Sequence, residues 1–168
     1  MRWFDRNFSF EIPLWLYPNI VERLRGTPAR IEELSRDLSK NVLTDRMNQS
    51  WSIQENIGHL WDLERLWYGR VEDFENGAEM LRPADLENRL THDADHNESE
   101  LSELLARFRT ERSQLVEKLD LADESFRSNV SLHPRLNQPM RVIDLAYFVA
   151  EHDDHHLARI SELIRALP

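Results

Sequence analysis

Apolar residues recur three and four positions apart along most of the chain, which is the spacing of an amphipathic helix rather than of a strand. We therefore expect helices and no pair of strands. The first helical pattern lies between Pro13 and Ser39 and is interrupted at Arg25-Gly26-Thr27-Pro28. Gly26 suits a helix end, and Thr27 followed by Pro28 suits an N-cap with proline at the first helical position. This element is predicted to be a broken pair of helices.

Three further helical patterns follow. The second begins with the capping box Ser52-Ile53-Gln54-Glu55 and runs to Glu75, with Gly77 just past its end. The third covers residues 97–119 and the fourth residues 139–167, and the first-to-second and third-to-fourth connections are the longer ones. This arrangement predicts an all-α protein in which residues 1–168 form a single four-helix-bundle domain.

Two histidines occupy the apolar stripe of the fourth helix. His152 and His156 are four residues apart, so both imidazoles project from the inward face of the helix about one turn apart. His59 lies inside the second helix, near Leu63 and Leu66 on the helical wheel, and also faces inward. Three histidines converging on one core would be costly unless something coordinates them. A divalent metal removes that cost, because neutral imidazole is a good ligand for Zn, Ni, Fe or Cu.

Several alternatives compete with a three-histidine metal site. Any one of these histidines, taken alone, is more simply a hydrogen-bonded core or rim residue. The run from His152 to His156 also resembles the zinc-protease H-E-x-x-H pattern, but Asp153 is one methylene shorter than the required Glu and only 168 − 156 = 12 residues follow His156. A di-iron carboxylate site needs more buried carboxylates than are visible in Glu64 and the pairs Asp93/His96 and Asp153/His156. One metal ion fits better than two.

Other side chains are candidates for the pocket wall or for hydrogen bonds behind the ligands. These are His96, Asp62, Trp67, Tyr147 and His155. His92 and His96 lie four apart in a polar segment and are more simply a solvated helix start. His133 precedes Pro134 and is interpreted as a loop residue. The sequence identifies no general base, so it leaves the catalytic residues unknown.

The composition of the chain argues against several classes of function. The chain has 168 residues, 21 Lys and Arg against 31 Asp and Glu, a formal net charge of −10 and no cysteine. Without cysteine there are no disulfides, thiolate metal sites or cysteine nucleophiles, so sulfur chemistry needs an incoming thiol. The acidic balance argues against nucleic acid and membranes as partners, and no segment approaches the roughly 20 apolar residues of a membrane span. Because MRWFDRNFSFEIP has no signal-peptide pattern, we expect a cytoplasmic protein.

The sequence resembles the DinB/YfiT-like superfamily, particularly its DinB-like branch. The matching stretches are WSIQENIGHL at residues 51–60, FVAEHDDHHLARI at 148–160, and residues 25–30 and 141–145. The resemblance implies a four-helix bundle, often dimeric, with one divalent metal held by three histidines. Carried over to this chain, the ligands would be His59, His152 and His156. Characterised relatives include S-transferases that use a low-molecular-weight thiol such as mycothiol, bacillithiol or glutathione, beside many members of unknown activity.

Three protein ligands leave a coordination position open, which is the arrangement of a catalytic metal. The leading hypothesis is a metal-dependent enzyme that acts on a small molecule and activates either a small thiol for S-transfer or a water for hydrolysis. Zinc or nickel is the expected ion, with iron or manganese as alternatives. The competing functions are a non-catalytic, stress-related protein that binds metal or a small ligand, and an interaction scaffold with a vestigial site.

Overall fold

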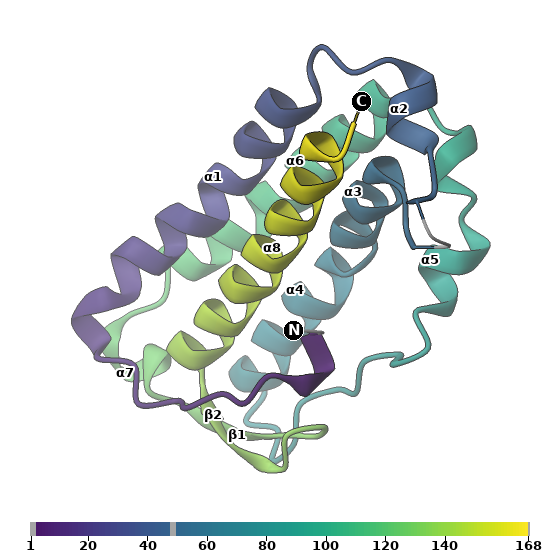
Figure 1. The fold of residues 1–168 in the computed structure, drawn as a ribbon. Coiled ribbons are helices and arrows are strands. Elements are labelled where there is room, and N and C mark those ends of the chain that lie inside the picture. Colours follow the sequence, from purple (N-terminus) through teal and green to yellow (C-terminus); the bar gives the residue numbers. More distant parts are fainter. Residues whose placement is uncertain (1–2, 48–49, 168) are drawn as a thin grey trace.

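Four long helical elements lie side by side in the computed structural model, which describes residues 3–47 and 50–167 (Figure 1). They are α1 (Tyr17–Ser35), α3 (Ile53–Asp62) followed by α4 (Glu64–Glu75), α6 (Leu101–Asp120) and α8 (Val142–Arg165). This confirms the predicted helical class and the four-helix bundle. The shorter elements are η1 (Trp3–Asp5), η2 (Leu14–Leu16), α2 (Lys40–Thr44), α5 (Arg89–Asp93), η4 (His96–Glu98), α7 (Glu124–Arg127), β1 (Val130–His133) and β2 (Gln138–Arg141).

Helix α1 is continuous, so the predicted break at residues 25–28 is wrong. Pro28 lies inside the helix and has no N–H to donate to the carbonyl of Leu24. That carbonyl accepts instead from Nη1 of Arg112 on α6, at 3.2 Å. A side chain from another helix therefore satisfies the group that proline leaves free, and the local signal for a helix end is overridden by packing.

Gly26 in the middle of α1 gives a stability prediction. A Cβ added at this position meets no heavy atom within 4 Å. Because Gly in a helix interior is less favourable than Ala by about 0.5–1 kcal/mol, Gly26→Ala is expected to stabilise the fold by about that amount in urea unfolding. Gly77 is the matched control, since its φ of +65° disfavours a side chain and Gly77→Ala should destabilise the protein. A loss of stability in Gly26→Ala would contradict the prediction.

The predicted second helix is present, but it is divided into α3 and α4. The Ser52–Glu55 capping box is confirmed: the Ser52 side chain accepts from the Glu55 N–H, and the Glu55 carboxylate accepts from the Ser52 N–H. The division falls at Leu63, whose N–H donates to the carbonyls of His59 and Trp61. The inward face of α3 therefore ends one turn after His59.

An antiparallel hairpin precedes α8, so the expectation of no strand pair is wrong. In its register Val130 lies opposite Arg141 and Leu132 opposite Pro139. The two strands have four residues each, too few for an alternating pattern to stand out, and Pro139 reads as a helix start in the sequence. The hairpin lies at the end of the bundle where α8 begins (Figure 1). His133, expected in a loop, is the last residue of β1 and is 2% exposed.

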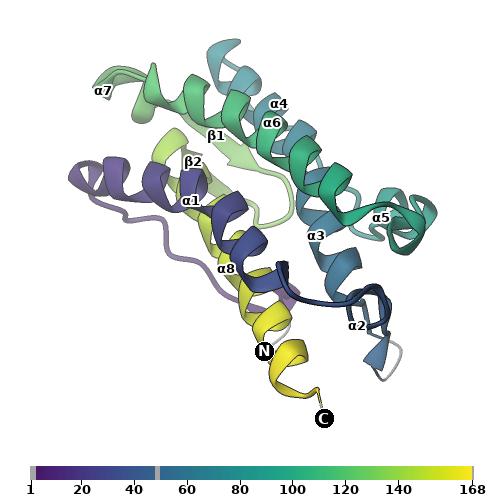
Figure 2. The same ribbon diagram turned by 90° about the horizontal axis from the view of Figure 1, so that it is seen from above.

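The apolar core is divided into two clusters along the length of the bundle. One surrounds Leu24, Trp67 and Phe148 toward the hairpin, and the other surrounds Ile57 and Phe108 toward α2. Between them each of the four helical elements contributes one buried polar residue, and these are Thr27, Glu64, Arg112 and Asp153. Figure 2 shows, from above, how α1, α3, α6 and α8 surround this interior.

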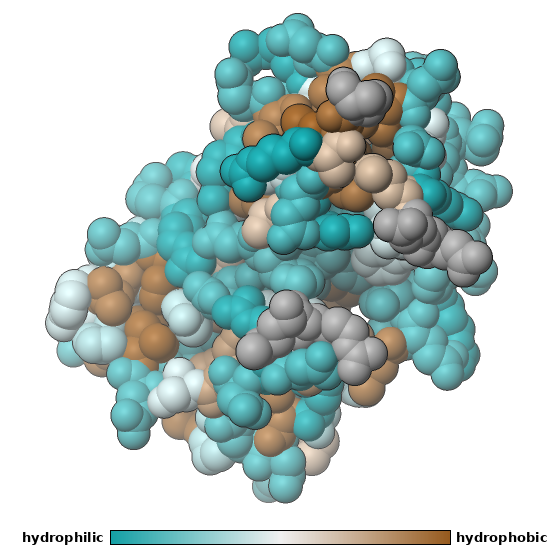
Figure 3. Space-filling model, viewed as in Figure 1, coloured by the Kyte–Doolittle hydropathy of each residue, from teal (hydrophilic) through white to brown (hydrophobic). Residues whose placement is uncertain are grey.

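The surface is mainly hydrophilic. The face seen in Figure 3 is covered mostly by polar and charged residues, with smaller hydrophobic areas between them. Among the described residues no helix is long and apolar enough to cross a membrane.

Candidate metal centre

His59, His152 and His156 come together between α3 and α8. The ring centroids are 5.3 Å apart for His59 and His152, 4.9 Å for His59 and His156, and 4.6 Å for His152 and His156. One nitrogen from each ring can be chosen so that all three lie within 4.8 Å of one another. All three residues are buried. The structure therefore brings the three predicted residues together, close enough for their nitrogens to converge on one ion.

A chain of hydrogen bonds orients His59. The hydroxyl of Thr91 donates to Oδ2 of Asp62 at 2.7 Å, and Nε2 of His96 lies 2.9 Å from the same oxygen. Since the single hydroxyl proton of Thr91 is used in this way, its oxygen accepts from Nδ1 of His59, 2.9 Å away. The proton of His59 is thereby placed on Nδ1, and Nε2 keeps the lone pair that a metal ligand needs.

His156 is oriented by an amide. Nδ2 of Asn56 donates to the backbone carbonyls of Ser52 at 2.7 Å and Trp51 at 3.3 Å, which fixes Oδ1 as the atom that faces His156. Oδ1 therefore accepts from Nδ1 of His156 at 2.8 Å. As in His59, the Nδ1 proton is held by a neighbour and Nε2 is left as the donor atom.

His152 has a different environment. Its Nδ1 is fully buried, and no hydrogen-bond partner lies within reach of it in the part of the chain that the structure describes. A buried polar nitrogen without a partner costs about 1–3 kcal/mol. Its ring is enclosed by Trp3, with a centroid distance of 4.9 Å, and by Trp67 at 5.7 Å. The orphaned nitrogen beside two other imidazoles is the observation expected where an ion completes the site.

Burial keeps these imidazoles neutral. It lowers the pKa of His59 to about 4, although Asp62 opposes the change, and it lowers the pKa values of His152 and His156 well below the ordinary 6.5, helped by the neighbouring rings. Neutral imidazole nitrogens are borderline ligands that suit Zn, Ni, Fe or Cu and are poorly matched to Ca or Mg. The three residues thus fit a divalent transition ion.

A cavity of about 800 Å³ adjoins the three histidines. Its aromatic walls include Trp51, which lies 4.7 Å from the His59 ring and 6.2 Å from the His156 ring between centroids. Trp3, Trp67 and Phe148 also line it, so the N-terminal turn η1, α4 and α8 all contribute. A cavity of this size holds a small organic molecule, and its aromatic walls favour an apolar body.

The other predicted site residues fall into three groups. Trp67 and His155 line the cavity. Asp62 and His96 lie behind His59 in the hydrogen-bond chain. His96 is 2% exposed, so the interpretation as a solvated residue is wrong for His96 and fits only the exposed His92. Tyr147 is not among the lining residues, and its ring lies 5.9 Å from the guanidinium carbon of Arg23. Thr91 and Asn56 were not predicted, because a single Thr in a short helix and a single Asn in a capped helix carry no distinctive pattern.

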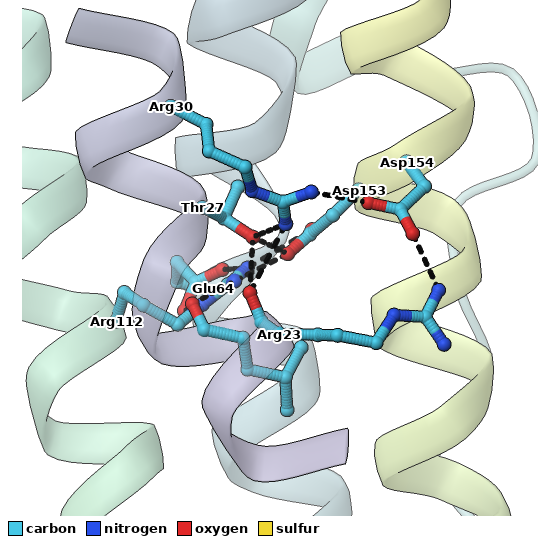
Figure 4. Close-up of polar contacts among 8 residues, drawn as sticks. Arg23, Thr27, Arg30, Glu64, Arg112, Asp153 and Asp154 are labelled. Atoms are coloured by element: carbon cyan, nitrogen blue, oxygen red, sulfur yellow. Dashed lines mark hydrogen bonds and ion pairs between the residues drawn. The ribbon is translucent and has the colours of Figure 1, made fainter. Parts of the chain in front are cut away.

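Asp153 does not line the cavity. It belongs to the buried polar layer, which consists of Thr27, Glu64, Arg112 and Asp153. Together with Glu64 it flanks Arg112, as Figure 4 shows. The guanidinium donates twice to Glu64, at 3.0 and 2.5 Å, twice to Asp153, and once to the carbonyl of Leu24, so all five of its N–H groups have acceptors. Asp153 also accepts from the Thr27 hydroxyl at 2.7 Å. It is a structural ion-pair partner, which agrees with the rejection of a zinc-protease motif.

Arg112 gives a second stability prediction. Arg112→Met would leave the carboxyls of Glu64 and Asp153 buried without a cation, which typically costs about 3–5 kcal/mol in the free energy of unfolding. Arg109→Met is the matched control on the same helix, because Arg109 is exposed and its pair with Glu32 is a surface pair. Urea unfolding measures both variants. Equal losses in the two would show that the buried layer adds no more than an exposed ion pair.

Comparisons with known proteins agree with this fold. A model of the DinB superfamily matches residues 23–160. YfiT from Bacillus subtilis, described as a probable metal-dependent hydrolase with an unusual four-helix bundle topology, superposes with a TM-score of 0.82 at 20% identity, over 95% of this chain and 92% of YfiT. The colibactin self-resistance protein ClbS, in a crystal structure with a dsDNA, has a TM-score of 0.69 at 13% identity, over 90% of this chain and 97% of ClbS. No curated protein sequence matches significantly.

The ClbS structure corrects one expectation. The net charge of −10 argues against nucleic acid as a partner, but that expectation is overturned, since a protein with this fold was crystallised with a dsDNA. A net charge averages over the whole surface, whereas phosphates are bound by local groups of cations. The acidic balance is therefore no ground for excluding nucleic acid.

Proposed function

The chain belongs to the DinB superfamily, and on this basis we propose that it is a metal-dependent hydrolase whose divalent ion is held by His59, His152 and His156. The proposal is supported above all by the three neutral imidazoles that converge at the wall of a cavity. A tightly packed core would have no such space beside the rings. YfiT, described as a probable metal-dependent hydrolase, has the same fold.

The residues around the proposed ion would have different roles in the reaction. A divalent ion held here would act as a Lewis acid and lower the pKa of a coordinated water. Thr91 and Asn56 hold the protons of His59 and His156 on Nδ1, so the opposite nitrogens stay available as ligands. Trp51 and Trp67 would exclude bulk water and pack against the substrate. His155, whose pKa burial lowers, is a neutral imidazole at the cavity wall that can accept a proton.

Thiol S-transfer is the second candidate. The cavity of about 800 Å³ is large enough for a low-molecular-weight thiol together with its electrophile, whereas a water nucleophile needs little of that space. The chain has no cysteine, so the sulfur would have to come with the ligand. Zinc or nickel fits the three nitrogen ligands in either reaction.

Two measurements on the full chain test the proposed function. Elemental analysis of protein purified without an affinity tag should give one divalent ion per chain. Turnover of a panel of esters, amides and lactones, with and without added thiols, should depend on that ion and be lost on chelation. Turnover only with thiol would favour the transferase. Stoichiometric metal without any turnover would favour a binding protein, and failure to take up Zn or Ni would refute the metal site.

Thr91→Val tests the hydrogen-bond chain behind His59. Valine keeps the shape of threonine but cannot accept from Nδ1 of His59, so the ring loses the group that fixes its proton and orientation. Losing such a partner typically lowers metal affinity by about 10–100-fold. Competition titration with a chromophoric chelator measures the change. Thr110→Val is the control, because Thr110 is exposed on α6 and bonds only its own helix. Unchanged metal affinity in Thr91→Val would show that the hydrogen bond from His59 to Thr91 does not contribute to metal binding.

A further inference from the structure

Three arginines line the same cavity as the three histidines: Arg70 on α4, Arg135 in the turn between β1 and β2, and Arg159 on α8, which is paired with Glu162. Arg70 is 1% exposed, yet no carboxylate pairs with it in the described part of the chain. Its Nε donates to the carbonyl of Arg82 at 3.1 Å, and its guanidinium lies over the Trp67 ring at 5.4 Å. Beyond these contacts and Nε2 of His133, 3.2 Å from Nη1, most N–H groups of this guanidinium have no acceptor among the described residues.

Arg135 is also without an anionic partner. Its Nη2 is buried and has no hydrogen-bond acceptor among the described residues. Its guanidinium carbon lies 5.3 Å from the centroid of the Phe4 ring, which offers no negative charge. Arg112 in the same bundle shows the contrast, since all five of its N–H groups have acceptors and two carboxylates balance its charge.

His133 lies between these groups with too few acceptor sites. Nη1 of Arg70 is 3.2 Å from its Nε2, and the backbone N–H of Leu136 points at its Nδ1 from 3.1 Å. Burial lowers the pKa of His133 to about 3, with help from both arginines, so the ring is neutral and has one lone pair. One lone pair cannot accept from two donors, so one N–H group always lacks an acceptor.

The acidic residues of the cavity are occupied elsewhere. The carboxylate of Asp85 accepts from the backbone N–H groups of Glu87 at 3.0 Å and Arg89 at 2.9 Å. Glu162 pairs with Arg159 at 3.1 Å. Neither neutralises Arg70, which stays a cation at neutral pH although burial lowers its pKa to about 10. Asp73 attracts this charge, but its carboxylate is already paired with Arg82 at 2.8 Å. A buried cation without an ion-pair partner of its own is costly, and a ligand anion would reduce that cost.

We propose that Arg70, Arg135 and His133 form an anion subsite that binds a carboxylate or phosphate group of the substrate. The guanidinium fork matches either oxyanion, and an oxygen near Nε2 of His133 would provide the missing acceptor. The inference rests on the proposed function in one respect, namely that the anchored molecule is the substrate and extends to the three histidines. In a chain of net charge −10 this cationic wall would also select anionic substrates locally.

Binding of inorganic phosphate and of acetate to the full-length protein tests the subsite. Calorimetric titration and thermal unfolding are carried out at constant ionic strength, with chloride as the reference anion, on both metal-loaded and chelator-treated protein. Phosphate or acetate should bind in both forms, and Arg70→Met should weaken the binding at least tenfold. Without added anion, Arg70→Met should be as stable as the parent protein or more stable, because an unpaired buried charge is removed. Arg65→Gln on the same helix is the control, since its side chain is 83% exposed.

Comparison of the phosphate and acetate titrations identifies the anionic group of the substrate. Preference for acetate indicates a carboxylate substrate, and preference for phosphate indicates a phosphate ester. Equal binding by the parent protein and by Arg70→Met, or a chloride effect of the same size, would overturn the proposal. If Arg70→Met fails to fold, Arg135→Gln takes its place with the same expected loss. Elemental analysis distinguishes the proposed anion subsite from the proposed hydrolase function. If the protein binds anions through Arg70 but takes up no metal, the metal-dependent hydrolase is refuted and the anion subsite is supported.

Discussion

Replacing His152 by leucine is expected to abolish stoichiometric metal binding while leaving the metal-free fold at least as stable as before. Removing one of three ligands from the proposed site should lower the affinity for zinc or nickel by a factor of at least about 100, more than the loss of an outer partner costs. The free energy of unfolding of the metal-free protein should not fall, because Nδ1 of His152 is a buried nitrogen without a partner among the described residues and leucine removes its desolvation cost. Few substitutions of a buried polar residue have this pair of outcomes.

Competition titration with a chelator gives the affinity, and urea unfolding in the presence of EDTA gives the stability. His92→Leu is the matched control, because His92 is exposed and lies outside the three-histidine cluster. Two results would count against the proposed site: a His152→Leu protein that still holds one ion per chain, or a loss of several kcal/mol in its metal-free form. The second would mean that the imidazole has a structural role at neutral pH.

The fold was predictable because helical periodicity is strong in this sequence. The apolar stripe of α8 runs through His152 and His156, so their burial could be inferred from spacing alone, and the same holds for His59 on α3. Their convergence required the further assumption that α3 and α8 are neighbours in the bundle. That assumption follows from the inward faces of both helices in one bundle and agrees with the resemblance to a known family, and the structure places the two helices in contact.

The errors came from interactions between distant parts of the chain. Pro28 is tolerated inside α1 because Arg112, 84 positions later (112 − 28), bonds the carbonyl of Leu24. Arg112 itself occupies a core position in the stripe of α6, between Phe108 and Leu115, and only its two carboxylate partners make that position possible. The hairpin at residues 130–141 and the role of Thr91 likewise depend on contacts that no local pattern encodes.

The metal-free protein is expected to unfold as the pH falls from 6.5 toward 4. Burial lowers the pKa of His155 and, more strongly, those of four further histidines: His59 to about 4, His133 to about 3, and His152 and His156 well below 6.5. In the unfolded chain histidine has a pKa of about 6.5. Below that pH the unfolded state takes up protons that the folded state cannot bind, so the stability present above pH 6.5 is lost as the pH falls.

One buried group acts in the opposite direction. Burial raises the pKa of Glu64 to about 7 despite the attraction of Arg112, so between about pH 7 and 4.5 the folded state holds a proton that the unfolded chain has released. Glu64 thus offsets one of the four histidines and leaves a net uptake of about three protons on unfolding near pH 5.5. Each proton corresponds to about 1.4 kcal/mol per pH unit, so stability should fall by about 4 kcal/mol per unit. A typical total stability of about 5–15 kcal/mol would then be exhausted within about one to four pH units.

Urea unfolding of EDTA-treated protein at pH 7.5, 6.5, 5.5 and 5.0 measures this slope. His152→Leu should lower it by one proton, about 1.4 kcal/mol per pH unit. Saturating zinc should move the acid transition to lower pH, since metal and proton compete for the same imidazole nitrogens. A stability that stays constant between pH 6.5 and 5.0 would show that the four rings remain solvated in the folded protein, and a dry three-histidine centre would then be untenable.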